Sequence, residues 1–191
     1  MRICVVTPWA NCHELAPGYL AAIQAADPDE VRVIDNGSDP PLDLPGCDVF
    51  RMDGNTGFSA ASNLGLRLTR CQAVVFLNND VRATGGNWLV PFRELLRPGV
   101  MVGASLVTSP HGTVDGRTVP YLDGWCVGGM TSDLKALGGW DEGYEEPAYF
   151  SDNDLSARAK AAGMRLVQAP VALRHLGNWT TRRMNVDEVT R

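Results

Sequence analysis

The stretch Val74–Asp80, VVFLNND, decides the fold class, because four apolar residues run directly into three polar ones. A continuous apolar run of this length is typical of a strand buried on both faces, as in a parallel sheet. The amide and carboxylate groups that follow it indicate either a ligand site at the edge of the sheet or a simple turn. From this stretch alone the two interpretations are about equally good.

Strands and helices alternate on both sides of this stretch. Apolar and β-branched runs predict further strands at Ile3–Val6, Val31–Ile34, Val49–Met52 and Met101–Val107. Apolar spacing and turn-forming ends predict helices at Pro17–Ala26, Phe58–Thr69 and Trp88–Leu96. This order predicts an α/β fold in which helices flank a central, mainly parallel sheet in a single domain.

The second half of the chain is less regular. We predict a loop or hairpin at residues 110–120, helices at Ser132–Leu137 and Ser151–Ala162, and strands at Tyr121–Val127, Leu166–Gln168 and Val171–Leu173. The first of these helices would be capped by Thr131 or Ser132, and the second by Asp152 or Asp154.

Composition narrows the class of protein. The 191 residues are 45% hydrophobic and 20% charged, which suits one soluble domain. The net charge of -5 argues against a nucleic-acid partner, which requires a basic face. Five cysteines without a C-x-x-C pair favour a reducing, cytoplasmic location, and peripheral contact with a membrane is left open. No apolar stretch is long enough to predict a transmembrane segment.

Polar residues follow the apolar run of each predicted strand in the first half. Thr7-Pro8, Asp35, residues 53–57 and Asn78–Asp80 take these positions. Because parallel strands end at the same edge, we expect all four tips to meet there and to form the ligand site.

Four residues could carry chemistry. Asp80 suits Mg²⁺, which typically takes one or two protein carboxylates together with substrate phosphates. His175 could complete such a site, although a lone histidine is more often structural. Gly57 opens a helix whose N–H groups could hold an anion, or its small neighbours could simply pack closely. Asp152, at the start of a helix, could accept a proton or cap the helix.

In order, these motifs resemble those of the family 2 glycosyltransferases of the GT-A fold. They are VVTPW (5–9), VIDNGS (33–38), NTGFSAASNLG (55–65), FLNND (76–80), LGGWDEGY (137–144), YFSDNDLSAR (149–158) and RH (174–175). The resemblance covers about residues 3–175. The N-x-G-F and LNND forms are most similar to a bacterial rhamnosyltransferase-like branch.

The resemblance implies a donor site for a UDP-, dTDP- or GDP-linked sugar. Its nucleoside pocket would be lined by Thr7, Pro8 and Asp35, and Gly57, Phe58, Asn63, Asn78 and Asn79 would support the donor. A divalent cation, Mn²⁺ or Mg²⁺, would be held by Asp80 and His175.

The resemblance also implies an inverting transfer to an acceptor hydroxyl. Asp152 would be the catalytic base, and the acceptor, a glycan, a lipid-linked glycan or a protein, would be bordered by Trp125, Trp140, Asp141 and Glu142. Residues 1–176 would form the GT-A domain, with a donor half at 1–107 and an acceptor and catalytic half at 108–176. In the tail, residues 177–191, Arg182 and Arg183 could reach the donor diphosphate or could simply be solvated charges.

Two departures from the family pattern keep another interpretation open. Asn78 replaces the first Asp of the D-x-D motif, and Ser151 replaces the Glu of an E-D pair. An inactive module that binds a sugar nucleotide or a glycan is therefore the alternative. A sugar nucleotidyltransferase fits less well, because TPWANCHELAPG (7–18) lacks a Gly-rich basic phosphate loop.

Overall fold

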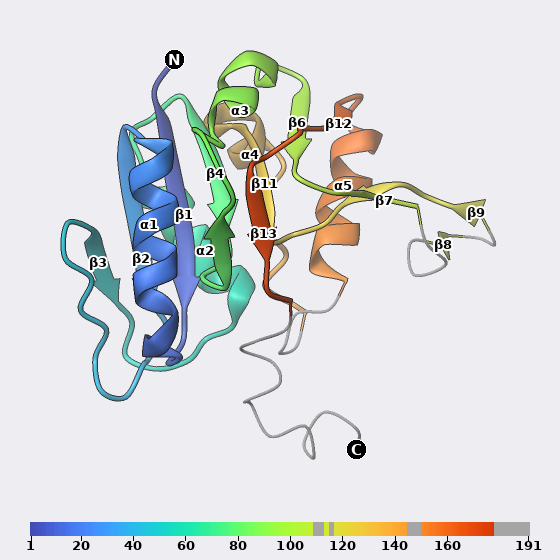
Figure 1. Ribbon diagram of the computed structural model, residues 1–191. Coiled ribbons are helices and arrows are strands. Elements are labelled where there is room, and N and C mark those ends of the chain that lie inside the picture. Colours follow the sequence, from blue (N-terminus) through green and yellow to red (C-terminus); the bar gives the residue numbers. More distant parts are fainter. Residues whose placement is uncertain (109–112, 115–116, 145–149, 178–191) are drawn as a thin grey trace.

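A seven-stranded sheet organises the chain (Figure 1). The computed structural model describes residues 1–108, 113–114, 117–144 and 150–177. The strands follow the order β12-β6-β11-β4-β1-β2-β3. Their bounds are β1 Ile3–Trp9, β2 Glu30–Asp35, β3 Asp48–Arg51, β4 Ala73–Leu77, β6 Val100–Gly103, β11 Cys126–Met130 and β12 Arg165–Gln168. All neighbours in this order pair in parallel except β11, which is antiparallel to both β4 and β6. This confirms the predicted mainly parallel α/β fold.

Helices cover both faces of the sheet. They are the short 3-10 helix η1 His13–Leu15 and the helices α1 Ala16–Ala26, α2 Phe58–Leu68, α3 Val90–Leu95, α4 Thr131–Ala136 and α5 Ser151–Ala161. In Figure 1, α1 lies in front of the sheet and α4 lies behind it. Three short strand pairs complete the fold: β5 Val81–Ala83 with β13 Leu173–His175, β7 Leu106–Val107 with β10 Tyr121–Leu122, and β8 Thr113–Val114 with β9 Arg117–Thr118.

The side-chain alternation of the central strands produces two hydrophobic cores. Ile3 and Val5 of β1 join the core under α1 and α3, whereas Cys4 and Val6 join the core under α2, α4 and α5. Successive residues of a strand point to opposite faces, so a strand covered on both sides must be apolar throughout. The same rule explains Val74–Leu77, all of whose residues are buried.

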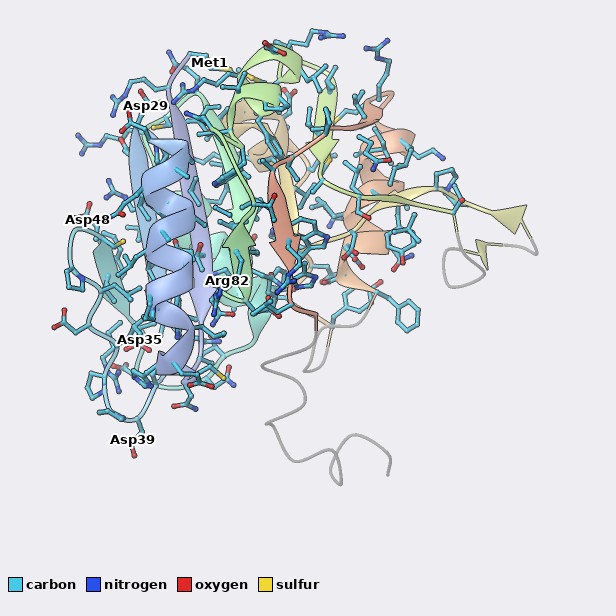
Figure 2. The ribbon with its side chains drawn as sticks, in the orientation of Figure 1. Met1, Asp29, Asp35, Asp39, Asp48 and Arg82 are labelled. Carbon is cyan, nitrogen blue, oxygen red and sulfur yellow. The ribbon has the colours of Figure 1, made fainter. Side chains whose placement is uncertain are left out.

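The four polar strand tips do share one edge, as the sequence predicts. In the parallel ladders, Trp9 pairs with Asp35, Asp35 pairs with Arg51, and Val6 pairs with Phe76. Figure 2 shows Asp35 toward the lower edge of the sheet, whereas Met1 and Asp29 lie at the upper edge. We call the lower edge, where the parallel strands end, the ligand edge.

The antiparallel strand β11 brings a further segment to the ligand edge. Its first residue, Cys126, pairs with Leu77, the last residue of β4. Because β11 runs the other way, it is the residues before the strand, Asp123–Trp125, that lie beside the polar tip of β4. The parallel strands end at this edge, whereas β11 begins there.

Several predicted elements differ from the structure. The predicted strand Met101–Val107 is divided between β6 and β7, and Tyr121–Val127 is divided between β10 and β11. The predicted end of the first strand at Val6 is too early, because β1 continues to Trp9 by pairing with β2 alone. Pro8 lies in that one-sided part, where its missing N–H breaks no bond to β4.

The residues at the cap positions of α4 and α5 are not those predicted. The residue before α4 is Met130, and the Thr131 hydroxyl instead donates to the Cys71 carbonyl oxygen. Phe150 takes the cap position of α5, and Asp152 and Asp154 follow in its first turn, where the Asp152 carboxylate accepts the N–H of Asn153. Within the described ranges, none of the helices combines the length and the apolar composition that crossing a membrane requires.

Candidate functional site

The tip of β4 brings two oxygen-bearing side chains to one imidazole. Asp80 Oδ1 lies 3.0 Å from His175 Nε2, and Asn78 Nδ2 lies 3.4 Å from the same nitrogen. Asp80 is almost completely buried. Asp80 and His175, predicted from the sequence as a pair of metal ligands, are therefore adjacent although 95 positions separate them in the chain.

Local strand pairing explains this proximity. The chain continues from Asp80 directly into β5, which pairs with β13 so that His175 stands opposite Val81. The N–H of Leu176 donates to the Asp80 carbonyl oxygen at 2.8 Å and extends the pairing by one step. Because register sets which side chains are neighbours, this short ladder fixes His175 beside Asp80.

The side-chain atoms at the tip of β4 are suitable ligands for a hard divalent cation. Carboxylate and amide oxygens with one imidazole are ligands that Mn²⁺ or Mg²⁺ accepts, and such ions usually keep positions for waters and substrate phosphates. Within the described residues, no three His, Cys, Asp or Glu side chains gather into a complete metal cage. Asp80 and His175 fit a cation whose coordination is completed by a ligand.

A buried hydrogen-bond donor beside Asp80 and His175 also favours a bound ligand at this point. Asn79 is 5% exposed, and its Nδ2 has no hydrogen-bond partner among the residues that the structure describes. An unpaired buried amide costs free energy, and bound ligands commonly relieve that cost. Asn79 is thus able to donate to an oxygen of a bound ligand, in line with its predicted donor contact.

Asp152 lies in the first turn of α5, and a backbone amide from another element holds its carboxylate. Oδ2 accepts a hydrogen bond from the N–H of Gly124 at 3.1 Å, and Oδ1 accepts one from the N–H of Asn153 at 2.9 Å. Burial raises the pKa of Asp152 above its usual range, these hydrogen bonds oppose the rise, and the charge of Asp123 adds to it. A half-buried carboxylate with a raised pKa is suited to accept a proton.

The turn Asp123–Trp125 joins Asp152 to the Asp80 and His175 pair. The Trp125 indole stacks on the His175 imidazole, with ring centroids 5.0 Å apart and planes within 8°. The Trp125 carbonyl oxygen accepts a hydrogen bond from the N–H of Asn78 at 2.8 Å. Trp125, predicted to border the acceptor, therefore contacts two residues of the predicted cation and donor site.

Asp123 is a site residue that the sequence prediction missed. The predicted strand Tyr121–Val127 includes Asp123, although the pair Asp123-Gly124 is a turn signal that divides this segment. Burial raises the pKa of Asp123, while His175 and the N–H groups of Trp125 and Gly124 lower it. Asp123 begins the turn whose next two residues contact Asp152 and His175.

The predicted nucleoside contacts Thr7 and Asp35 are both hydrogen-bonded to other parts of the protein. Thr7 is fully buried, and its hydroxyl accepts a hydrogen bond from the Tyr19 hydroxyl. The Asp35 carboxylate accepts from the N–H groups of Ser38 and Leu42 and from the Arg51 guanidinium. Burial alone would raise the pKa of Asp35, but these hydrogen bonds outweigh it and lower the pKa. Pro8 is half-buried between these two positions.

Gly57 and Phe58 begin α2, and the loop before them is fastened to the tip of β2. The Asn36 side chain accepts from the N–H of Thr56 and donates to the Gly57 carbonyl oxygen. Gly57 has a φ of 93°, a backbone conformation that glycine adopts without strain. The start of α2, which is predicted to hold an anion, is therefore fastened to the end of β2.

Asn63 and Trp140 dock the turn after α4 onto α2. The Asn63 side-chain amide accepts a hydrogen bond from the backbone N–H of Trp140. It donates to the Trp140 carbonyl oxygen and to Glu142 Oε1, and each of the three distances is 2.8 Å. The Trp140 ring is 2% exposed and packs edge-on against Phe58 and Phe76. Asn63, predicted to support the donor, therefore lies against residues predicted to border the acceptor.

An open cleft of about 390 Å³ lies beside this docked turn. It is lined by Asn63, Leu137–Glu142 and Arg158. Asp141 and Glu142 are exposed there, and Arg158 is bound to Asp154 and to the Leu137 carbonyl oxygen. The structure thus brings Trp140, Asp141 and Glu142 together at the cleft, whereas Trp125 stacks on His175.

Arg182 and Arg183, the predicted diphosphate contacts, lie outside the described residues. Another arginine, Arg82 in β5, stands toward the ligand edge in Figure 2. Its Nη1 donates to the Val81 carbonyl oxygen at 2.8 Å, and none of the described acidic side chains forms an ion pair with it. The sequence prediction did not single out this cation.

Comparisons with solved structures identify the fold as GT-A. A mannosyltransferase from Pyrobaculum calidifontis, solved with GDP-Man and Mn²⁺, has a TM-score of 0.68 and 19% identity over 88% of this chain and 55% of its own. TarS from S. aureus, also solved with UDP, has a TM-score of 0.63 and 17% identity over 91% of this chain and 59% of its own. The chain thus spans less than two thirds of either protein.

Sequence comparison assigns the family. Among curated proteins, no sequence is similar enough to match the chain. The family model described as glycosyl transferase family 2 matches residues 4–184, which include the tip of β4, Asp152 and His175. The chain belongs to glycosyl transferase family 2.

Proposed function

We propose that this chain is an inverting glycosyltransferase that moves a sugar from a nucleoside-diphosphate sugar to an acceptor hydroxyl. The observation that carries the proposal is the ligand edge itself. Asp80 and His175 lie 3.0 Å apart at one side of the Asp123–Trp125 turn, and Asp152 is hydrogen-bonded to the other side of that turn. A cation and leaving-group site beside a partly buried base is the arrangement that such a transfer requires.

The donor diphosphate would lie over the tip of β4. Asp80 and His175 would hold a divalent cation, Mn²⁺ or Mg²⁺, which as a Lewis acid stabilises negative charge on the departing diphosphate. The neighbours solved with GDP-Man and Mn²⁺ or with UDP support this donor class. Asn79 Nδ2 and the N–H groups at the start of α2 would donate hydrogen bonds to the donor.

Asp152 would remove the proton of the acceptor hydroxyl. As that oxygen attacks the anomeric carbon from the face opposite the diphosphate, the bond from this carbon to the diphosphate oxygen breaks and the configuration inverts. The Gly124 N–H holds one carboxylate oxygen in place, so the base enters the reaction already oriented. The raised pKa of Asp152 makes it a stronger base, and it remains ionised at neutral pH only to the extent that pH exceeds that pKa.

The finer assignments are the transfer of a hexose or deoxyhexose, the rhamnosyltransferase-like branch and a cytoplasmic reaction. They rest on the N-x-G-F and LNND motifs and on the reduced cysteines. In the same proposal, residues 1–107 supply the donor half and 108–176 the acceptor half. The open cleft at Trp140, Asp141 and Glu142 supplies a polar surface suited to a hydroxyl-rich acceptor such as a glycan.

The test measures hydrolysis and transfer with a panel of UDP-, GDP- and dTDP-sugars in the presence of Mn²⁺. Asp152→Asn should lower turnover about a hundredfold or more, because a general base typically contributes that much. Binding of the same donor, measured by calorimetry, should stay within about twofold, because Asn retains an oxygen for the Gly124 N–H.

Near-normal turnover in Asp152→Asn would show that another group removes the proton. Donor binding by the wild type without hydrolysis or transfer across the panel would instead favour the inactive binding module, for which Asn78 and Ser151 are the motivation.

A further inference from the structure

Arg82 in β5 is a half-buried cation that no described acidic side chain neutralises. Its Nη1 donates a hydrogen bond to the carbonyl oxygen of the preceding residue, Val81, at 2.8 Å. The ion pairs among the described side chains do not include it, and the other N–H groups of its guanidinium have no acceptor among the described residues. Because a guanidinium carries five N–H donors, several of them remain for a bound ligand.

The β5–β13 ladder places a second arginine directly opposite the first. Arg174 of β13 pairs with Arg82, next to the pair formed by Val81 and His175. Arg174 is exposed and likewise forms no ion pair with the acidic side chains that the structure describes. Like charges directly opposite each other across an antiparallel pair destabilise it. The two neighbouring cations therefore favour the binding of an anion at this end of the ladder.

Gly18, in the first turn of α1, leaves the space that the Arg82 guanidinium occupies. A Cβ on Gly18 would overlap the central carbon and two nitrogens of this guanidinium. α1 packs against β5, and Figure 2 shows Arg82 between α1 and β13. The first turn is the positive end of the helix dipole, so α1 does not offset the charge of the arginine. The guanidinium is thus held in place by a contact that leaves its charge unbalanced.

Arg82 also lies close to the proposed cation site. It follows Asp80 by two positions, and the hydrogen bond from the Leu176 N–H to the Asp80 carbonyl oxygen extends the strand pairing to that residue. Two extended residues span about 7 Å at most, so the Cα atoms of Asp80 and Arg82 are no farther apart than that. A ligand with two adjacent anionic groups can therefore contact a divalent cation at Asp80 and the guanidinium of Arg82 together.

We infer that Arg82 binds the diphosphate of the sugar donor. The planar guanidinium matches two phosphate oxygens, and beside the divalent cation it would stabilise the negative charge of the departing diphosphate. The inference rests on the proposed function for the identity of the ligand, whereas the position and the unpaired charge of Arg82 rest on the contacts alone. Hydrogen bonds between charged groups typically contribute roughly tenfold to a hundredfold to affinity.

The first experiment compares a nucleotide with its uncharged nucleoside. NMR titration, which also covers weak binding, measures the affinity with Mn²⁺ for GDP, UDP or dTDP, whichever binds the wild type most tightly, and for the matching nucleoside. Arg82→Gln should weaken binding of the nucleotide about tenfold or more and leave that of the nucleoside unchanged, because the nucleoside offers no anion. Equal losses for both ligands, or no loss for the nucleotide, would overturn the inference.

Gly18→Ala tests the same contact without changing a charge. The added methyl group displaces the guanidinium, whereas alanine favours a helix more than glycine does. The variant should therefore unfold at a temperature no lower than the wild type and still bind the nucleotide more weakly, as Arg82→Gln does. The double variant should bind no more weakly than Arg82→Gln alone, because both changes remove one interaction. Full additivity, or an unchanged affinity in Gly18→Ala, would contradict the position assigned to Arg82 and overturn the inference.

The matched control is Arg165→Gln. Arg165 is also a strand arginine without an ion pair among the described side chains. It begins β12 beside Val100, at the edge of the sheet opposite the ligand edge. Loss of this positive charge should leave the affinity for the nucleotide unchanged. If Arg165→Gln weakens binding as much as Arg82→Gln does, the effect belongs to the overall charge of the protein, and the inference is wrong.

Inorganic phosphate separates this inference from the proposed function. The Nε–H signal of Arg82, assigned in the NMR spectrum with Arg82→Gln, should shift when phosphate is added to the wild type and shift less in Gly18→Ala. A phosphate shift combined with unchanged nucleotide affinity in Arg82→Gln would mean that Arg82 binds the phosphate of another ligand, such as a lipid-linked acceptor, and would overturn the inference alone. A wild type that binds none of the three nucleotides with Mn²⁺ contradicts the proposed function itself.

Discussion

Two carboxylates at the ligand edge, the buried Asp35 and the half-buried Asp152, have opposite effects on protein stability. Hydrogen bonds from Ser38, Leu42 and Arg51 outweigh burial and hold the pKa of Asp35 below its usual value of 3.8. Burial has the largest effect on the pKa of Asp152 and holds it above 3.8. Asp35 is therefore more favourable when charged in the folded protein, and Asp152 is less favourable when charged.

This contrast predicts opposite pH dependences for two conservative variants. Asp35 contributes stability above pH 3.8 that is lost as the pH falls through its lower folded pKa, so Asp35→Asn should cost more free energy of unfolding at pH 7 than at pH 3. Asp152 destabilises the folded protein once the pH rises above 3.8, so Asp152→Asn should become relatively more stable between pH 4 and pH 7. Urea unfolding across this pH range measures both, and parallel curves for the two variants would contradict the assignment.

The sequence motifs predicted that Asp80 and His175 lie together, which the structure shows, but they did not show the internal hydrogen-bond partners of Thr7, Asp35 and Asn63. All of these are polar side chains near strand or helix ends, which is the pattern of a ligand contact. Only the structure shows that Tyr19 holds the Thr7 hydroxyl and that Trp140 holds the Asn63 amide. A sequence does not reveal which polar group finds its partner within the protein.

At the scale of elements, the alternation of apolar runs and helical spacing was sufficient to predict the parallel half of the sheet. The strand β11 could not be oriented in this way, because apolar residues on a central strand look the same in either direction. The consequence is local and specific: the start of β11 reaches the ligand edge, and Asp123 with it. A single reversed strand therefore accounts for the turn at this edge that the sequence did not predict.

The docking of the 138–142 turn onto α2 gives a prediction for two adjacent glycines. Both Gly138 and Gly139 have a positive φ, of 86° and 72°. A Cβ on Gly139 would lie 2.3 Å from Asn63 Oδ1, whereas a Cβ on Gly138 would meet nothing within 4 Å. Gly138→Ala should therefore cost only backbone strain, about 1 kcal/mol, whereas Gly139→Ala should cost about 3 kcal/mol because it also displaces a buried amide with its hydrogen bonds.

Chemical denaturation of the two variants measures this difference, and Gly138→Ala serves as the control for strain. Equal losses of stability in both would mean that Asn63 does not hold the turn. A Gly139→Ala variant that also loses acceptor use, while its donor affinity stays normal, would connect the turn with the acceptor side of the proposed reaction.

At the scale of the whole molecule, one edge of one sheet collects the site from distant parts of the chain. The tips of β1, β2 and β4 come from the first half, whereas the turn before β11, the start of α5 and the end of β13 come from the second. The sequence order of the motifs was enough to indicate the family, which the family model over residues 4–184 establishes. The distances between these motifs in space could be obtained only from the folded structure.

The central claim is that the tip of β4 holds a nucleoside diphosphate together with a divalent cation. The most direct measurement is calorimetric titration of GDP, UDP and dTDP with and without Mn²⁺, for the wild type and for Asp80→Asn. For at least one nucleotide, Mn²⁺ should tighten binding to the wild type by about tenfold or more and should have little effect on Asp80→Asn, because the carboxylate charge is what attracts the cation. Binding that is equally tight without Mn²⁺, or a Mn²⁺ effect that survives in Asp80→Asn, would contradict the account.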